Sequence, residues 1–240
     1  MPQQNLLTLD VAADSTKRMS RNKAKSPTTL SNTPEKLLAV AIDLFSRKGF
    51  KGTSIRDIAS NLGMTTSNIY HYFGTKAGVL AAIERQTLEP ILCEFRRIAD
   101  LDLPPLDRFT LLIKTHLAYM DTHRKESTIF SLSEETLSSG TNGSRRYHKE
   151  TFSIYRREIE RLLSTEGIRG NTTLAAFNTL GTIIWFLRWY RQGGSCSLEE
   201  VTDNIVSYVL HGILGCDSST RRRPQAGARS HVPGNGQEKS

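Results

Sequence analysis

The chain has 240 residues, enough for one large or two small domains, and its 32 lysines and arginines against 24 aspartates and glutamates give a formal net charge of +8. A basic excess of this size favours a polyanionic partner such as nucleic acid. Three cysteines without a C-x-x-C spacing argue against a disulfide framework and a zinc site. No apolar run approaches the roughly 18 residues of a membrane span. We therefore expect a cytosolic protein without metal, cofactor or membrane contact.

The two ends of the chain are basic and polar. Residues 1–33 and residues 217–240 each hold five basic side chains against two acidic ones, so each end contributes +3 to the net charge. We expect both ends to be disordered, because they are rich in Ser, Pro, Gln, Asn and Gly and lack the apolar period needed to offset the entropy of ordering. The two ends have two alternative roles: they increase solubility, or they attract DNA phosphates non-specifically.

The first ordered element is expected to be an amphipathic helix. Thr33 is a suitable N-cap, Pro34 suits the first helical position and Gly49 supplies the stop, with apolar residues at a helical period between them. Thr53 is expected to cap a second, shorter helix, which Gly63 ends.

Further helical patterns follow along the rest of the chain. Thr65 caps a third helix, and Thr75 caps a fourth that Pro90 is expected to kink or break. Ser197 and Glu200 form a capping box for the last helix. The remaining helices are predicted at residues 106–123, 127–137, 145–167 and 172–190. No useful stretch alternates with a period of two, so we predict an all-α fold of about nine helices.

The second and third helices have the pattern of a helix-turn-helix. Such a motif needs a small residue where the helices cross, a turn residue that tolerates positive φ, and apolar side chains that fix the crossing angle. Ala59, Gly63 and Ile69 are among the residues that meet these needs. The predicted recognition helix spans residues 65–72.

The polar side chains around this motif suit DNA. Short or planar groups can hydrogen-bond base edges in the major groove, while hydroxyls, an ammonium group and helix N-termini can bind phosphate. The residues expected at base edges are Thr66, Ser67, Asn68 and His71. The residues expected at phosphates are Thr53, Thr65, Tyr70, Tyr72 and Lys76. The two tyrosines can also pack their rings in a core, and a helical module that binds protein is the alternative class of function.

Residues 34–80 resemble the N-terminal DNA-binding domain of the TetR family of bacterial transcriptional repressors. The segments that carry the resemblance are "AIDLFSRKGF", "TSIRDIASNLGMT" and "NIYHYFGTK". Tyr72 stands where the family pattern has a histidine, and His71 lies one place earlier. The resemblance implies a homodimer on double-stranded DNA with a pseudo-palindromic operator, released by a small-molecule effector that binds within residues 81–216. Activation in place of repression stays open.

Residues 182–214 are also similar to the end of family members that sense acyl-CoA thioesters. This similarity implies an effector from lipid or steroid catabolism; a drug or aromatic compound sensed by an efflux regulator is the alternative. The residues expected at the ligand are Tyr155, Trp185, Arg188 and Trp189. The residues expected at the dimer interface are Ile183, Leu187, Ile205, Tyr208, Val209 and Gly212. The aromatic residues can instead pack the core, and the absence of any recognisable catalytic motif predicts that the protein is not an enzyme.

Overall fold

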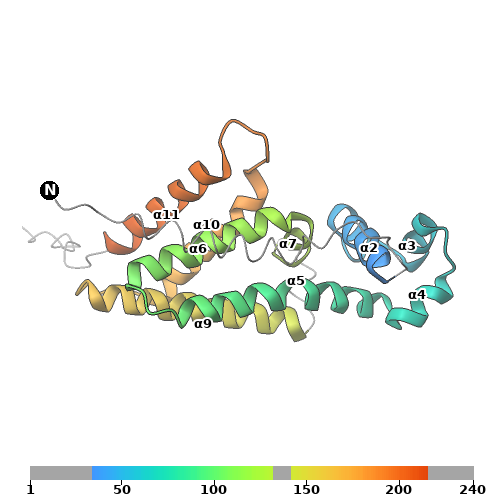
Figure 1. Cartoon of the computed structure of the whole chain (residues 1–240), viewed down its shortest axis with the longest axis horizontal. Helices are drawn as coiled ribbons and strands as arrows, with labels where there is room; N and C mark the ends of the chain where they lie inside the picture. Colours follow the sequence, from blue (N-terminus) through green and yellow to red (C-terminus); the bar gives the residue numbers. More distant parts are fainter. Residues whose placement is uncertain (1–33, 132–141, 216–240) are drawn as a thin grey trace, which may run out of the picture.

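The structure is a computed structural model and describes residues 34–131 and 142–215. Over these residues the chain forms nine helices and no strand, which confirms the predicted all-α fold (Figure 1). The helices are α2 (Pro34–Lys48), α3 (Ile55–Leu62), α4 (Thr66–Phe73), α5 (Lys76–Ala99), α6 (Pro105–Thr122), α7 (Arg124–Ser131), α9 (Asn142–Thr165), α10 (Thr172–Trp189) and α11 (Leu198–Leu214). The two ends predicted to be disordered and the predicted cap Thr33 lie outside the described residues.

Local sequence signals explain several helix ends. α2 begins at Pro34, as predicted. Gly63 ends α3 in the left-handed conformation, with φ at 61°, which a residue without a Cβ adopts at least cost. The Thr75 hydroxyl accepts the backbone N–H of Gly78 at 2.9 Å and caps α5. Ser197 and the third residue of α11 form the predicted capping box.

The predicted cap of α3 is wrong by one residue. Ser54 is the N-cap: its hydroxyl accepts the backbone N–H of Asp57 at 3.1 Å, and its own N–H donates to the Asp57 carboxylate at 2.7 Å. Thr53 is buried and donates its hydroxyl to the Gly49 carbonyl at 2.9 Å. Thr53 and Ser54 both carry a hydroxyl that could cap the helix. Ser54 is the cap because it alone forms a capping box with Asp57.

The expected break at Pro90 is also absent, because α5 continues without interruption from Lys76 to Ala99. A proline removes one helical N–H and crowds the preceding turn. Here the helix is buried on both sides of that position, at Leu88 and Ile91, and the Tyr119 hydroxyl donates to the carbonyl of Thr87 at 2.6 Å. Tertiary packing therefore holds the helix together across the proline.

The long helix α5 connects the two ends of the molecule. Figure 1 shows α2, α3 and α4 grouped at one end of α5, while its other half lies in a bundle with α6 and α9, and α10 and α11 follow. No boundary is visible at residues 80–81, since α5 spans them, so the division into residues 34–80 and 81–216 stays a prediction. None of the described helices has the length and apolar character needed to cross a bilayer.

A buried ion pair joins the helices of the bundle. Arg108 of α6 donates to Glu158 of α9 at 2.5 Å, and Glu158 is fully buried. The same guanidinium donates to the carbonyls of Leu101 and Leu103 at 3.1 Å each, while Arg161 pairs with the second Glu158 oxygen at 2.7 Å. These bonds hold the α5–α6 connection against α9, because both Glu158 oxygens are paired and Arg108 also binds two carbonyls of the connection.

Helix α7 contacts both ends of the molecule. Lys125 pairs with Asp43 of α2 at 2.6 Å. The neighbouring Arg124 donates to the carbonyls of Leu187 and Tyr190 at the end of α10, at 2.9 and 2.5 Å. The first turn of α7 therefore links the α2–α4 group to the C-terminal end of α10.

Candidate DNA interface and effector pocket

Helix α4 lies at the end of the molecule (Figure 1), and most of its polar and aromatic side chains are exposed there. Its buried residue is Ile69, which is fully enclosed and fixes the helix against its neighbours. Ser67, Asn68 and His71 are exposed. Figure 1 places this surface at the far end from α11, where a long partner such as a DNA duplex can approach it.

The two tyrosines of α4 are not core residues. Tyr70 is 51% exposed and Tyr72 is 45% exposed, while Phe73 is only partly buried. Their rings and hydroxyls are therefore available on the same side of the molecule as the rest of α4. This placement agrees with the phosphate contacts expected for them, which remain a prediction.

The N-terminus of α4 differs in detail from the expected cap. Thr65 occupies the N-cap position, but its hydroxyl makes no bond to the backbone of the helix. It donates instead to the side-chain oxygen of Asn68 at 3.2 Å. That bond orients Asn68 and leaves its amide NH2 as the donor for a partner. Thr66, the first residue of α4, is half-buried.

Lys76 is positioned by the backbone of the α2–α3 connection. Its ammonium group donates to the carbonyls of Phe50 and Thr53 at 2.8 and 2.9 Å, and it lies 4.3 Å from the centroid of the Phe50 ring. An ammonium has three donors, so two are used internally. Lys76 therefore holds the start of α5 against the turn before α3, whereas the hydroxyl of Thr53 is buried and does not reach the surface.

The four residues expected at the ligand are not brought together. Tyr155 is fully buried in the bundle, whereas Trp185 and Trp189 are 63% and 49% exposed on α10. Arg188 is exposed beside them. None of the four lines the pocket between α5 and α9 that is described below. An apolar helix such as α10 does not reveal from its sequence which face is turned outward.

A chain of buried polar groups surrounds Tyr155. The ring nitrogens of His116 lie 3.0 Å from the hydroxyl of Tyr155 and 3.4 Å from the hydroxyl of Tyr147. The Tyr155 hydroxyl also donates to the carbonyl of Leu112 at 3.3 Å. Tyr155 therefore accepts from His116 Nδ1–H, and His116 Nε2 accepts from Tyr147. Burial lowers the pKa of His116 to about 3, so the imidazole is neutral.

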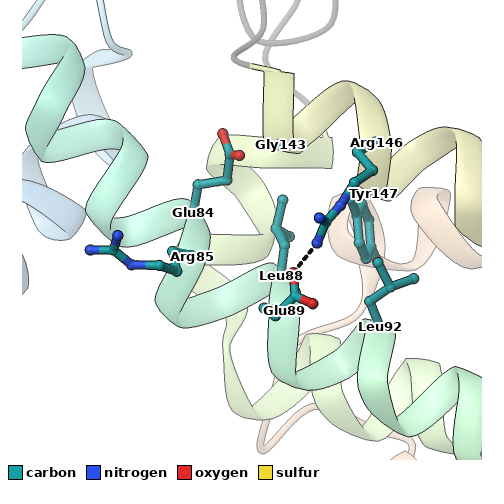
Figure 2. A pocket seen from close by; sticks show the side chains of 8 residues that line it. All are labelled: Glu84, Arg85, Leu88, Glu89, Leu92, Gly143, Arg146 and Tyr147. Atoms are coloured by element: carbon teal, nitrogen blue, oxygen red, sulfur yellow. Dashed lines mark hydrogen bonds and ion pairs between the residues drawn. The ribbon is translucent and has the colours of Figure 1, made fainter.

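The described residues form a pocket of about 250 Å³ between α5 and α9 (Figure 2). Its lining residues are Glu84, Arg85, Leu88, Glu89, Leu92, Gly143, Arg146 and Tyr147. Sequence reasoning missed this site. One signal was available: Glu84 lies four residues from both Leu80 and Leu88, so a carboxylate interrupts an apolar stripe of α5.

Ion pairs connect α5 and α9 along the rim of this pocket. Glu89 pairs with Arg146, as the dashed line in Figure 2 shows. Arg96 donates to both oxygens of Glu150, at 2.5 and 2.9 Å, and the guanidinium holds the pKa of that carboxyl below its usual value. The Glu89–Arg146 pair is exposed and adds little stability, whereas the Arg96–Glu150 pair is partly buried and lies outside the pocket lining.

The residues expected at a dimer interface are divided between the interior and the surface. Ile183, Leu187, Ile205 and Val209 are buried within the single chain. Tyr208 is 71% exposed, and Gly212 is exposed. The exposed apolar residues of α10 are Leu174, Phe177, Trp185 and Trp189. Of these, only Trp185 and Trp189 were predicted from the sequence to be functional, and they were predicted as ligand contacts. The helical spacing of Leu174, Phe177 and Trp185 was the sequence signal for a shared face.

Two protein-family models match successive parts of the chain. The family model described as "Bacterial regulatory proteins, tetR family" matches residues 37–83, and the one described as "Tetracyclin repressor-like, C-terminal domain" matches residues 102–213. The chain is 27% identical over 184 residues to the HTH-type transcriptional repressor KstR2 of Rhodococcus jostii, covering 74% of this chain and 89% of the relative.

Solved structures are similar over most of their length. A transcriptional regulator of the TetR/AcrR family from Thermobifida fusca is 31% identical, with a TM-score of 0.56, covering 75% of this chain and 97% of that one. AibR in complex with isovaleryl coenzyme A and operator DNA is 22% identical, with a TM-score of 0.63, covering 73% of this chain and 96% of that one.

Proposed function

The chain belongs to the TetR family of bacterial regulatory proteins and is a transcriptional repressor of that type rather than an enzyme; from this premise we propose that a homodimer binds a pseudo-palindromic operator through α4 and is released by an acyl-CoA thioester. The main support for DNA binding is the exposed polar surface of α4. Ile69 anchors the helix, and Ser67, Asn68 and His71 are exposed on it. Small polar groups on a rigid helix suit base edges in the major groove.

A dimer follows from the small size of the recognition helix. α4 has eight residues and offers few base contacts, whereas two copies related by a two-fold axis double them at half-sites about one helical turn or more apart. The exposed apolar residues of α10 and α11 support the same conclusion, because Phe177, Trp185 and Tyr208 are each at least 60% exposed in the single chain.

The effector class rests on two similarities. Residues 182–214 are similar to the end of acyl-CoA-sensing members, and the related AibR structure contains isovaleryl coenzyme A together with operator DNA. The pocket between α5 and α9 has apolar walls at Leu88 and Leu92, with Arg146 on its rim. Its volume of about 250 Å³ is smaller than the range of about 300–1,000 Å³ for drug-sized ligands, so only the acyl end of a thioester fits inside it.

Release requires that the effector binds one conformation better than the other. A ligand with equal affinity for the DNA-binding and the released state shifts nothing. A coupling free energy of roughly 1 to 3 kcal/mol is the usual scale for such linkage. α5 is the element through which this coupling passes in our proposal, because it begins beside α4 and lines the pocket in its middle.

The test is a gel-shift assay with the purified full chain and DNA from upstream of its own gene, at one stated salt concentration. Butyryl-CoA, butyrate and an aromatic drug are added in separate lanes. Release by the thioester alone is the expected result. Release by the drug alone would favour the efflux alternative, and binding that no compound disturbs would remove the effector part of the proposal. A chain that binds no DNA at moderate salt would contradict the role of α4.

A further inference from the structure

Arg124 fastens the C-terminal end of α10 to the first turn of α7. Its guanidinium donates to the carbonyl of Leu187 at 2.9 Å and to the carbonyl of Tyr190 at 2.5 Å. The last turn of a helix leaves carbonyl groups without a partner inside the helix, and a cation at that end is also favoured by the helix dipole. Arg124 therefore satisfies the end of α10 from a different helix.

The surroundings of Arg124 hold its side chain in place. Its Nη1 atom lies 4.0 Å from Oδ1 of Asp121, and both atoms are shielded from water, without a hydrogen-bond partner among the described residues. Gln192, which follows α10, donates to the other Asp121 oxygen at 2.8 Å. The guanidinium also lies 6.0 Å from the centroid of the Phe186 ring, which stacks on the Tyr190 ring with 4.7 Å between the centroids. Several side chains thus hold the end of α10 against α6 and α7.

Helix α7 also contacts α2, in the α2–α4 group. α2 packs against α7 as well as against α3 and α5. Ile129 and Phe130 of α7 are buried, and Lys125 pairs with Asp43 of α2 at 2.6 Å. The Lys125–Asp43 pair is exposed and contributes little stability, so apolar packing supplies most of the stability of this contact. One short helix therefore joins the end of α10 to the α2–α4 group.

The bonds to Arg124 fall on the part of α10 that we propose for the dimer. Trp185 and Trp189 are exposed within one turn of Leu187, so the residues that face a partner and the carbonyls held by Arg124 share the same stretch of helix. The other connection from the bundle to α4 is α5, which runs unbroken from Lys76 to Ala99. A long helix can bend along its length. The contact through α7 holds the α2–α4 group at a second point.

We propose that Arg124 is a positioning residue that sets the half-site spacing accepted by the dimer. This inference rests on the proposed function, because it needs a dimer that reads two half-sites with α4. Each base pair inserted between the half-sites separates them by about 3.4 Å and rotates one against the other by about 34°. Two α2–α4 groups held firmly relative to the dimer face match one spacing, whereas groups on looser connections match several.

The test measures binding of the full chain to labelled duplexes by fluorescence anisotropy. The duplexes carry the protected site from upstream of its own gene, with no change, one or two base pairs inserted between the half-sites, or one or two removed. A further duplex carries a single half-site and reports recognition by α4 alone. Sedimentation velocity at the same protein concentration confirms that each variant is a dimer.

We expect the wild type to bind the best spacing at least about tenfold more tightly than spacings changed by two base pairs. In Arg124→Met this preference should fall to about threefold or less, with unchanged affinity for the single half-site. Arg124→Lys is the second variant: it keeps the charge but cannot donate to both carbonyls in the same geometry, so its preference should also fall. Arg156→Met removes an exposed arginine of α9 as the matched control and should keep the wild-type preference.

The spacing series separates this inference from the proposed function. A wild type that is not a dimer or binds none of the duplexes would overturn both. A wild-type dimer that binds all spacings equally would overturn the role of Arg124 alone. The same holds if Arg124→Met keeps the wild-type preference, or weakens every duplex by the same factor as a merely structural residue would. If Arg124→Met does not form a folded dimer, Arg124→Lys decides by the same criteria.

Discussion

Asn68 and His71 are the residues on which base recognition depends most directly in our proposal. Both are exposed on α4, and the Thr65 hydroxyl orients the Asn68 side chain. Sequence reasoning predicted these two residues because helix-turn-helix motifs are local: the turn, the caps and the exposed positions fall within about twenty consecutive residues. It did not predict Glu84 as a site residue, because its partner Gly143 is far away in the sequence and only the packing of α9 on α5 brings them together.

Replacing Asn68 or His71 by alanine should weaken operator binding without changing the thermal stability. A lost base contact costs about 1 to 3 kcal/mol, which is roughly 5- to 150-fold in affinity. Fluorescence anisotropy with labelled operator DNA measures this loss, and thermal unfolding monitors the fold. Gln86→Ala removes an exposed amide on α5 as a control and should bind as the wild type does. Unchanged affinity in both α4 variants would contradict the assignment of the recognition helix.

His116 makes the stability of the fold depend on pH. Its pKa is about 3 in the folded chain and about 6.5 when unfolded, so its contribution is complete above pH 6.5 and is lost as the pH falls towards 3. His148 titrates in the same direction, because burial lowers its pKa as well. Between pH 6 and pH 5 we expect the free energy of unfolding to fall by about 1 kcal/mol for His116 alone.

Urea unfolding at pH 7, 6 and 5 and at one protein concentration measures this slope. The variant His116→Gln should be less stable at pH 7, because it disturbs the bonds to Tyr147 and Tyr155. Its stability should nevertheless decline less between pH 6 and pH 5, since the group that takes up the proton on unfolding is gone. Equal slopes in the two proteins would show that His116 is not held neutral.

The helix ends that were predicted correctly are those set by residues close in the sequence, whereas effects of distant residues were missed. The ends at Gly63, Thr75 and Ser197 are confirmed, because each is set by a glycine or a hydroxyl within a few residues. The cap of α3 was misplaced by one residue, since two hydroxyls adjoin there. Pro90 was predicted to kink or break the helix, and no break occurs, because helix packing outside the local sequence supports both halves of α5.

Arg108 should be the most costly single residue to replace in the bundle. In Arg108→Met, Glu158 loses its main partner inside the core and two carbonyls lose their donor, so we expect a loss of about 3 to 5 kcal/mol in the free energy of unfolding. The double variant Arg108→Met/Glu158→Leu should recover part of this loss, because it removes the unpaired charge. Chemical unfolding of both variants measures the difference; a loss below about 1 kcal/mol in the single variant would contradict a structural role for the pair.

For the whole molecule, we propose that the outer face of α10 forms the dimer interface. From the sequence, Ile183 and Leu187 were predicted at the interface, whereas both are buried in the single chain. An amphipathic helix shows its inner face in its sequence; a helix that buries one face in its own chain and another in a partner does not. The structure shows that Leu174, Phe177 and Trp185 are residues exposed on this helix face, which their spacing in the sequence also allows.

Changing this face should dissociate the dimer. In Leu174→Ser/Trp185→Ser, the apolar area available for burial is reduced, at about 25 cal/mol for each Å². We expect a monomer in sedimentation velocity at micromolar concentration and a loss of operator affinity of tenfold or more. Leu106→Ser, at an exposed leucine on α6, is the control and should stay dimeric. A double variant that remains a dimer would place the interface elsewhere.

The most direct test of the account is a DNase I footprint of the purified full chain on the DNA upstream of its own gene. Two copies of α4, related by a two-fold axis, should protect one site with two symmetric halves about one helical turn or more apart. The Asn68→Ala/His71→Ala double variant should lose this protection at the same concentration. No protected site, or a site without two-fold symmetry that the double variant protects equally well, would contradict recognition of an operator by α4.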